Sequence, residues 1–267
     1  MIHLQQNHTE NRTRFFEPYV RMVVENSKYI IKTADSMSEL LDVLAFRGRI
    51  FSEEYNAPIA SGALDIDRHD FQCDHLIIKT RDSDQIVGTY RMLCSRFTQD
   101  FYSSNEFSIG EFLSTEGVKL ELGRACIAKE HRKGAVLHLL WRGVIQYAME
   151  TKADYLFGCS SVKTESYGAS MVIRDDLEKN GNLCQQWNIE PVSKYRFTIQ
   201  DKMSDFVEEV SIPPLLRTYI KAGAKVCAEP AYDREFHCLD YLTILKLDEL
   251  KDNFERKYKG AGVCSDS

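Results

Sequence analysis

A glutamate and an arginine stand inside one of the apolar runs of this 267-residue chain. The run is Leu120–Ile127, its charged members are Glu121 and Arg124, and its composition predicts a buried β-strand. Charges in such a strand are costly unless partners or a function compensate. Residues three apart point to opposite faces of a regular strand, but Gly123 permits a β-bulge that would turn both charges to one side. We therefore expect a bulged strand with Glu121 and Arg124 facing one cleft; the alternative is a surface ion pair on an edge strand.

A turn and a helix follow this strand. Helical spacing of apolar residues predicts a helix over about 135–151. Free backbone N–H groups at a helix start, with basic side chains beside them, suit a phosphate. Together with the strand predicted at 155–159, these segments form a β-α-β unit whose two strands would be parallel neighbours. The residues of the turn that would hold the phosphate are His131, Arg132, Lys133 and Gly134.

The remaining segments alternate between strand-like and helical patterns, which indicates an α/β (α+β) fold with a mixed, mostly antiparallel central sheet flanked by helices. We divide the chain into an N-terminal extension over 1–28, one domain over 29–250 that includes a C-terminal extension, and a polar tail over 251–267. Helices are expected after the capping pair Ser36 and Glu39, near Tyr167–Lys179 and from Pro213. Strands are expected at Tyr29–Lys32, His75–Lys79, Ile86–Leu93, Tyr195–Ile199, Ala224–Cys227 and Cys238–Leu247, with a hairpin turn at Arg81–Gln85.

Composition excludes several classes of protein. With 43% hydrophobic and 28% charged residues, the chain has the make-up of a soluble globular protein, and no apolar run reaches the about 18 residues of a membrane helix. The polar N-terminus lacks a secretory signal. The eight cysteines form no Cys-x-x-Cys pair, which favours reduced thiols in the cytoplasm over disulfides or zinc. A net charge of -6 argues against a general nucleic-acid binder.

Further charged residues stand in or beside apolar segments. Arg91 interrupts the strand at 86–93, and Arg47 lies on the first predicted helix. Asp65, Asp67 and Asp70 lie close together ahead of the strand at 75–79, where we expect them to bind the amino group of an acceptor and to help remove its proton. The alternative is a solvated acidic loop or a hydrogen-bonded turn, and an EF-hand is excluded because its glycine and terminal glutamate are missing.

A bulged strand that leads to a phosphate-binding turn and a helix resembles the core of the GNAT-type acyltransferases. Their usual turn is Gln/Arg-x-x-Gly-x-Gly/Ala, whereas this chain has His131 first, Gly134 fourth and Val136 last. In that family the small last residue lets the backbone approach the pyrophosphate of coenzyme A. A carrier-protein donor has one phosphate on its pantetheine arm, so this departure favours acyl-carrier-protein over acyl-coenzyme A.

The charged residues also resemble those of the autoinducer synthases, GNAT-like enzymes that take acyl groups from acyl-carrier-protein. A closer resemblance, from about Ala45 to Leu245, is to the ornithine-acyltransferase family, also called hemolysin-like. The segments that carry it are Cys73–Leu76, Val87–Arg91, Phe101–Phe107, Glu121–Arg124, Leu140–Trp141, Leu156–Ser160 and Pro213–Leu216.

This resemblance implies transfer of a fatty acyl or 3-hydroxyacyl group from acyl-carrier-protein to the α-amino group of an amino acid, typically ornithine, to give a lyso-lipid. Relatives use other acceptors such as glycine, so the acceptor stays open. Two alternatives are an acyl-homoserine-lactone synthase, which would use S-adenosylmethionine, and a non-catalytic acyl-binding protein on a GNAT scaffold. No bound cofactor, metal or nucleic acid is expected. A lipid product is compatible with transient contact between a cytoplasmic protein and the inner membrane surface.

The proposed reaction assigns a role to each charged residue. An amino acid's amine must lose a proton before it attacks a thioester, and Glu121, helped by Asp67, is the expected base. The acceptor would be bound by Arg47, Asp65, Asp70, Arg91 and Arg124, with Arg124 or Arg91 holding its carboxylate. A backbone N–H near the bulge would polarise the thioester carbonyl. Direct transfer needs no acyl-enzyme, so Cys159, His75 and His138 are expected to be structural.

Overall fold

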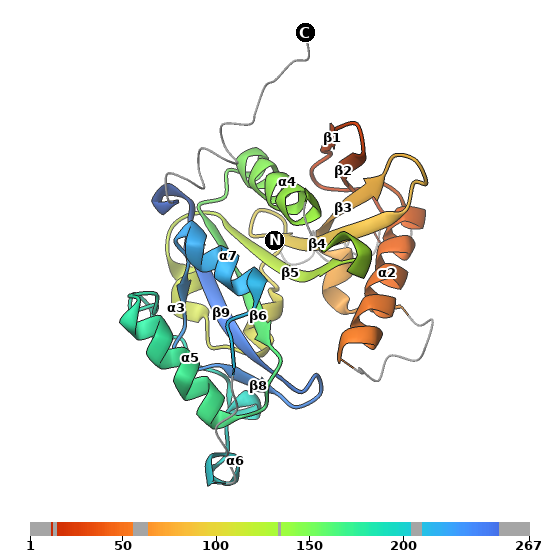
Figure 1. Cartoon of the computed structure of the whole chain (residues 1–267). Helices are drawn as coiled ribbons and strands as arrows, with labels where there is room; N and C mark the ends of the chain where they lie inside the picture. Colours follow the sequence, from red (N-terminus) through yellow and green to blue (C-terminus); the bar gives the residue numbers. More distant parts are fainter. Residues whose placement is uncertain (1–11, 13–14, 56–63, 133–134, 204–209, 251–267) are drawn as a thin grey trace. The chain divides into compact units, whose positions relative to one another are not determined.

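The structure, a computed structural model, describes residues 12, 15–55, 64–132, 135–203 and 210–250. They form two compact units (Figure 1). The first contains the chain up to Asp100 together with Leu120–Ala153, and the second contains Phe101–Lys119 and the chain from Asp154 onward. Residues 29–250 contribute to both units, so the single domain expected over this span stays a prediction. The predicted tail, 251–267, lies outside the described residues.

An antiparallel ladder forms the sheet of the first unit. Its strands pair in the order β1 (Val23–Glu25), β2 (Tyr29–Thr33), β3 (Asp74–Thr80), β4 (Ile86–Cys94) and β5 (Lys119–Ile127). The predicted β3–β4 hairpin is confirmed, since the N–H of Thr80 donates to the carbonyl of Gln85 over 3.0 Å.

Two helices cover opposite faces of this sheet (Figure 1). A Cβ on Gly143 of α4 (Ala135–Thr151) would lie 2.7 Å from Leu76 of β3, so α4 packs closely on the face to which Leu76 points. The next residue of β3, Ile77, joins the core cluster that contains Leu40 and Leu44 of α2 (Met37–Tyr55). Consecutive strand residues point to opposite faces, so α2 covers the other side.

The segment before β1 is anchored to the first unit through Asp74. This buried carboxylate accepts the Arg12 guanidinium at 3.2 Å and the backbone N–H groups of Tyr19 and Val20 at 2.9 Å. From the α4 side, the Tyr147 hydroxyl donates to it at 2.9 Å. One buried carboxylate thus ties the N-terminal segment, β3 and α4 together.

The second unit is built around a long antiparallel pair, β6 (Tyr155–Val162) and β9 (Cys238–Lys246). Two short strands, β7 (Lys225–Val226) and β8 (Ala231–Asp233), also pair with β9. Its core includes Ile173 and Leu177 of α5 (Tyr167–Lys179) and Leu216 of α7 (Pro214–Ala222). The unit's other helical segments are η2 (Tyr102–Asn105), α3 (Gly110–Ser114), η4 (Ser193–Tyr195), α6 (Ile199–Met203) and η5 (Leu247–Glu249).

The structure confirms the predicted α/β class with a mostly antiparallel sheet flanked by helices. The strand expected at Tyr195–Ile199 is wrong, because η4 ends at Tyr195 and α6 begins at Ile199. Thr198 and Asp201 explain the difference, since each side chain accepts the backbone N–H of the other (2.7 and 3.1 Å) in the reciprocal pattern of a helix start. The predicted parallel pairing between 120–127 and 155–159 spans both units and stays a prediction.

The sequence also predicts reduced thiols and no apolar run long enough to cross a membrane. The seven cysteines in the described part of the chain are free, and five of them are buried, which confirms the expectation of reduced thiols there. Among the described helices, none has the length and apolar character needed to cross a membrane.

Candidate functional site

The charged residues predicted from the sequence gather on the α2 side of the first unit's sheet. His75 lies opposite Arg91 in the β3–β4 ladder, and Arg91 lies opposite Gly123 in the β4–β5 ladder. Directly paired residues point to the same face, and so do residues two apart in one strand. His75 therefore shares its face with Ile77, which packs under α2, and Glu121 shares its face with Gly123. We call this surface of β3, β4 and β5 the charged face.

Arg47 reaches the charged face from α2 and holds the acidic segment. It is fully buried, and its Nε and Nη1 donate to Asp65 Oδ2 at 2.7 Å and Asp70 Oδ1 at 2.6 Å. Its Nη2 also donates to the backbone carbonyl of Asp65 at 2.8 Å. Both carboxylates are buried as well. The acidic segment is therefore fixed to the helix. A solvated loop is wrong, whereas the other form of that alternative, a hydrogen-bonded turn, is confirmed.

A short helical turn, η1 (Arg68–Phe71), orients the other acids. The Asp67 side chain accepts the N–H of His69 at 2.8 Å, and the Asp70 side chain accepts the N–H of Asp67 at 2.8 Å. This is a reciprocal capping box, which requires side-chain acceptors three residues apart. The spacing of the two aspartates thus fixes the turn and aims their remaining contacts at the arginines.

Arg91 and Arg124 complete one ionic network. Arg91 Nη1 donates to Asp67 Oδ2 at 2.7 Å and lies 3.5 Å from Asp70 Oδ1. Arg124 Nη2 donates to the same Asp67 oxygen at 3.3 Å, and its Nε lies 3.4 Å from Asp65 Oδ2. The Arg91 side chain is 1% exposed, whereas those of Arg124 and Asp67 are 18% and 24% exposed. The Arg124–Asp67 pair is therefore the part of this network that solvent reaches more readily.

The predicted bulge in β5 is confirmed. The register of β4 and β5 shifts between Thr89 and Arg91, where Arg124 and Ala125 together oppose one residue of β4. The left-handed conformation falls on Arg124, with φ 51°, and not on Gly123 as the sequence suggested. Such a φ costs a non-glycine residue about 1 kcal/mol. The network that holds the Arg124 guanidinium offsets this cost.

The bulge places Arg124 on the side to which Glu121 points. Arg124 contacts the Asp67 oxygen that Arg91 also contacts, so its guanidinium lies on the charged face. Glu121 is 1% exposed and shares this face by alternation. The shared side is confirmed, and the cleft in front of it stays a prediction.

The arginines keep the aspartates ionised. Burial alone would raise the pKa of Asp67, but the hydrogen bond with His69 and the charge of Arg91 hold it well below its usual range. Burial would also raise the pKa of Asp70, and the charge of Arg47 helps to lower it to about 2. A carboxylate with so low a pKa is a weak proton acceptor. These contacts disfavour a deprotonating role for Asp67 and suit it to holding a cation.

His75 and Cys73 are packed behind the network. His75 Nε2 lies 3.0 Å from the Asp70 carbonyl oxygen, to which it donates, and burial lowers the pKa of His75 to about 4. The ring is therefore neutral at pH 7. Asp70, Cys73 and His75 carry ligand-type atoms within 4.8 Å of one another, but the Asp70 carboxylate already binds Arg47 and Nε2 carries a proton. This trio supports the packing of the acidic turn and is unsuited to a metal ion.

Cys159 and His138 have positions compatible with structural roles. Cys159 lies on β6, half-buried, with its Sγ 3.5 Å from Ser103 Oγ. His138 lies at an exposed position of α4.

The structure describes half of the predicted phosphate-binding turn. His131 ends η3 (Lys129–His131), where its Nδ1 lies 3.2 Å from the Tyr29 hydroxyl. Arg132 follows, is partly exposed and pairs with Glu54. The other two predicted residues, Lys133 and Gly134, lie outside the described residues.

Val136 packs against the sheet at the start of α4. It is buried, and a Cβ on Gly88 of β4 would lie 2.9 Å from Val136 Cγ1. The glycine therefore makes room for the valine under the helix. The bulk of the Val136 side chain faces the sheet, so the prediction that this residue disfavours approach of a pyrophosphate is wrong.

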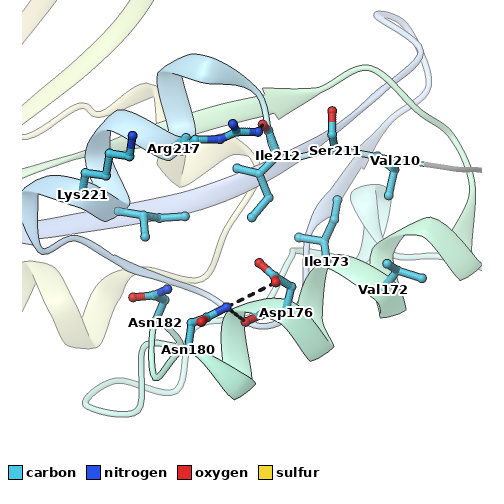
Figure 2. Close-up of a pocket in the computed structure, with 11 residues that line it drawn as sticks. Val172, Ile173, Asp176, Asn180, Asn182, Val210, Ser211, Ile212, Arg217 and Lys221 are labelled. Atoms are coloured by element: carbon cyan, nitrogen blue, oxygen red, sulfur yellow. Dashed lines mark hydrogen bonds between the residues drawn. The ribbon is translucent and has the colours of Figure 1, made fainter.

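A separate hollow of about 630 Å³ occurs in the second unit (Figure 2). Apolar side chains from α5 and from the segment ahead of α7 meet there, with two basic residues of α7 on one wall. None of the site residues predicted from the sequence lines it. Its lining includes Ile173, Asp176, Ile212, Arg217 and Lys221.

Sequence reasoning also passed over a second group of buried acids, Glu106, Asp233 and Asp240, in the second unit. Glu106 precedes the apolar Phe107, and Asp240 interrupts the apolar strand β9. A charge in an apolar run is the signal that singled out Glu121. It was available for Asp240 but not for Glu106, which follows the polar residues 103–105.

The chain is similar to a family model, to curated proteins and to solved structures. Residues 46–142 match the model of the acetyltransferase (GNAT) domain, and this span contains every predicted site residue. The L-ornithine N(alpha)-acyltransferase of Rhizobium meliloti (strain 1021) is 31% identical over 248 residues, covering 85% of this chain and 83% of the relative. The enzyme of that name from Brucella abortus (strain 2308) is 28% identical over 247 residues, covering 85% and 88%. Among solved structures, the AHL synthase LasI is similar with a TM-score of 0.48 at 15% identity, covering 91% of this chain and 100% of that one.

Proposed function

The chain belongs to the family of the L-ornithine N(alpha)-acyltransferases, and from this premise we propose that it moves a fatty acyl or 3-hydroxyacyl group from acyl-carrier-protein to the α-amino group of ornithine. The identity to the Rhizobium meliloti enzyme over 85% of the chain carries this proposal. It makes the chain an acyltransferase of lyso-lipid synthesis. We place the reaction in the cytoplasm, with the lipid product leaving at the inner membrane surface.

The charged face offers complementary groups for an amino acid. Arg124 is the more exposed guanidinium of the network, and it binds the acceptor carboxylate through two parallel N–H groups. Asp67 lies 3.3 Å from it, stays ionised and attracts the acceptor's ammonium group. Arg47 and Arg91 are buried, so their task is to hold the aspartates in place.

Glu121 takes the proton. It shares the charged face with Arg124 and is buried beside it in β5. In the reaction Glu121 first takes one proton from the acceptor's ammonium group and releases it to solvent. The neutral α-amine then attacks the thioester carbonyl carbon, Glu121 accepts the second amine proton, and this proton passes to the sulfur as the carbon–sulfur bond breaks and the pantetheine thiol leaves. The bulge leaves a residue out of the regular ladder, and its backbone N–H polarises the thioester carbonyl.

The donor enters by the turn before α4. Arg132 is partly exposed there, and Lys133 and Gly134 continue the same turn in sequence. Basic side chains beside a helix start attract both the phosphate of a pantetheine arm and the acidic surface of its carrier protein.

An acceptor competition tests the proposed function. The purified protein is incubated with a 3-hydroxyacyl-carrier-protein and an equimolar mixture of ornithine, lysine, glycine and S-adenosylmethionine, and products are read by mass spectrometry. We expect acyl-ornithine as the main product and its loss in Glu121→Gln. Acyl-glycine or an acyl-homoserine lactone as the main product would replace the ornithine assignment by that alternative.

A further inference from the structure

Three acidic side chains meet inside the second unit. Glu106 directly follows η2, Asp233 ends β8, and Asp240 lies in β9. All three are buried, and one carboxylate oxygen of each lies within 4.8 Å of the others. The three segments that carry these acids belong to the same compact unit, so the cluster is part of the folded interior of that unit.

Glu106 is aimed into this cluster without a partner of its own. Its side chain is 0% exposed, and in the described part of the chain neither carboxylate oxygen has a hydrogen-bond partner. A buried carboxylate in that state is strongly unfavourable, because it has lost its water and gained nothing in return. The structure therefore leaves a place for a ligand that can face this group.

The other two carboxylates are held in fixed orientations. Asp233 Oδ1 accepts the backbone N–H groups of Glu235 at 2.8 Å and Phe236 at 3.0 Å. Asp240 Oδ1 accepts the Ser161 hydroxyl at 2.5 Å. Two preoriented carboxylates beside a third form a rigid set of oxygen donors.

The charge of the cluster indicates the charge of the ligand. Three buried carboxyl groups converge on one point, and in their ionised form they carry three negative charges. A cation with two positive charges balances such a set better than a proton or an ammonium group does.

We propose that Glu106, Asp233 and Asp240 form a binding site for a divalent cation of the calcium type. Calcium lies 2.3 to 2.6 Å from its oxygen ligands, so two ligands of one ion lie up to about 5 Å apart, and the three carboxylate oxygens lie within that span. Magnesium demands near-ideal octahedral geometry and gives up its waters reluctantly, whereas calcium accepts irregular sets of carboxylate oxygens. The donor atoms are carboxylate oxygens, which bind hard cations in preference to soft cations. The bound ion would fasten the β8–β9 hairpin to the segment after η2, independently of the acyl transfer.

Calcium titration of the full chain tests this site. The protein is freed of metal with EGTA, titrated with CaCl2 by calorimetry, and its Tm is recorded with EGTA and with calcium. We expect one bound calcium per chain and a rise in Tm with calcium. In Glu106→Gln the affinity should fall by about tenfold or more and the rise in Tm should vanish. The Tm of this variant in EGTA should equal or exceed that of the wild type, since glutamine is neutral, which shows that the loss is not misfolding.

The matched control is Glu178→Gln, which makes the same chemical change at an exposed position of α5 in the same unit. It should bind calcium as the wild type does. If the wild type binds neither calcium nor Mn²⁺, or if Glu106→Gln responds to calcium as the wild type does, then Glu106 is a protonated acid packed beside two carboxylates and the proposal is wrong.

Discussion

Asp67 joins the two halves of the ionic network, because one of its oxygens caps η1 while the other contacts both Arg91 and Arg124. Its environment changes what its substitution is expected to do. A solvated carboxylate could be neutralised at little cost in stability, whereas Asp67 is the nearer carboxylate to the buried Arg91. Stability and acceptor binding are therefore coupled at this residue.

Asp67→Asn should lower the free energy of unfolding by about 2 kcal/mol, since it leaves the buried Arg91 guanidinium short of an anion. It should also lower kcat/KM for the amino acid by an amount equivalent to about 2 kcal/mol or more, because an amide does not attract the acceptor's ammonium group. Urea unfolding and initial rates measure the two effects. Asp100→Asn, which removes the exposed partner of Arg68, is the control and should change neither. Wild-type stability in Asp67→Asn would contradict the ionic network.

His75 makes the stability of the protein depend on pH. Its pKa in the folded state is about 4, against about 6.5 when unfolded, so between these values the unfolded chain binds more protons. Stability should then fall as pH falls from about 6.5 to about 4, by about 3 kcal/mol from this residue alone. The lowered pKa of Asp70, about 2, acts in a separate window below about pH 4.

His75→Gln should remove this dependence, because glutamine keeps an N–H donor for the Asp70 carbonyl but does not titrate. The measurement is urea unfolding at pH 7, 6, 5 and 4.5 for both proteins. We expect the variant to lose much less stability than the wild type across that range. Parallel curves would show that the buried ring does not carry the effect.

The bulge of β5 organises the charged face. Two substitutions of Arg124 separate the effect of its backbone conformation from the effect of its charge. Arg124→Gly and Arg124→Ala both remove the guanidinium, but only alanine keeps a Cβ at φ 51°. The glycine variant should be more stable than the alanine variant by about 1 kcal/mol. Both should show the same loss of acceptor kcat/KM, of about tenfold or more. An alanine variant as stable as the glycine variant would mean that the bulge relaxes when the arginine is gone.

At this scale the sequence predicted elements better than pairings. Glu121, Gly123 and Arg124 were sufficient to predict a bulged strand, because buried charges and a strand glycine leave few alternatives. The position of the left-handed residue was not predictable, since the ionic network decides it and not local propensity. The pairing of Arg47 with Asp65 spans 18 residues and depends on how α2 packs on the sheet.

Two local signals were misread or passed over. Aromatic and β-branched residues over 195–199 suggested a strand, but Thr198 and Asp201 cap a helix there, and the capping pattern was visible in the sequence. Glu106 belongs to a segment that resembles the acyltransferase family, and it follows polar residues, so it does not interrupt an apolar run. Its burial without a partner is a tertiary property, which no pattern within the chain displays.

For the whole molecule, the proposed donor is another protein, so charge should control the encounter. Arg132→Glu should reduce kcat/KM for acyl-carrier-protein by about tenfold at low salt and make the rate less sensitive to salt. Glu54→Gln is the matched control, because it breaks the same ion pair but keeps the basic residue. It should leave carrier-dependent transfer intact or faster. Equal losses in both variants, or acyl-coenzyme A serving as well as acyl-carrier-protein, would contradict the carrier-protein donor.

We propose that the charged face presents the α-amine of ornithine, and not its side-chain amine, to the thioester. Two blocked forms of ornithine, each acetylated at one nitrogen, distinguish reaction at the α-amine from reaction at the side-chain amine. Acyl-carrier-protein is the donor, and the acylated product is measured by tandem mass spectrometry. We expect that ornithine acetylated on its side-chain nitrogen is acylated, while ornithine acetylated on its α-nitrogen gives no product. Acylation of ornithine that is acetylated on its α-nitrogen would contradict this proposal. So would a result in which neither blocked compound reacts and free ornithine is acylated on its side-chain nitrogen.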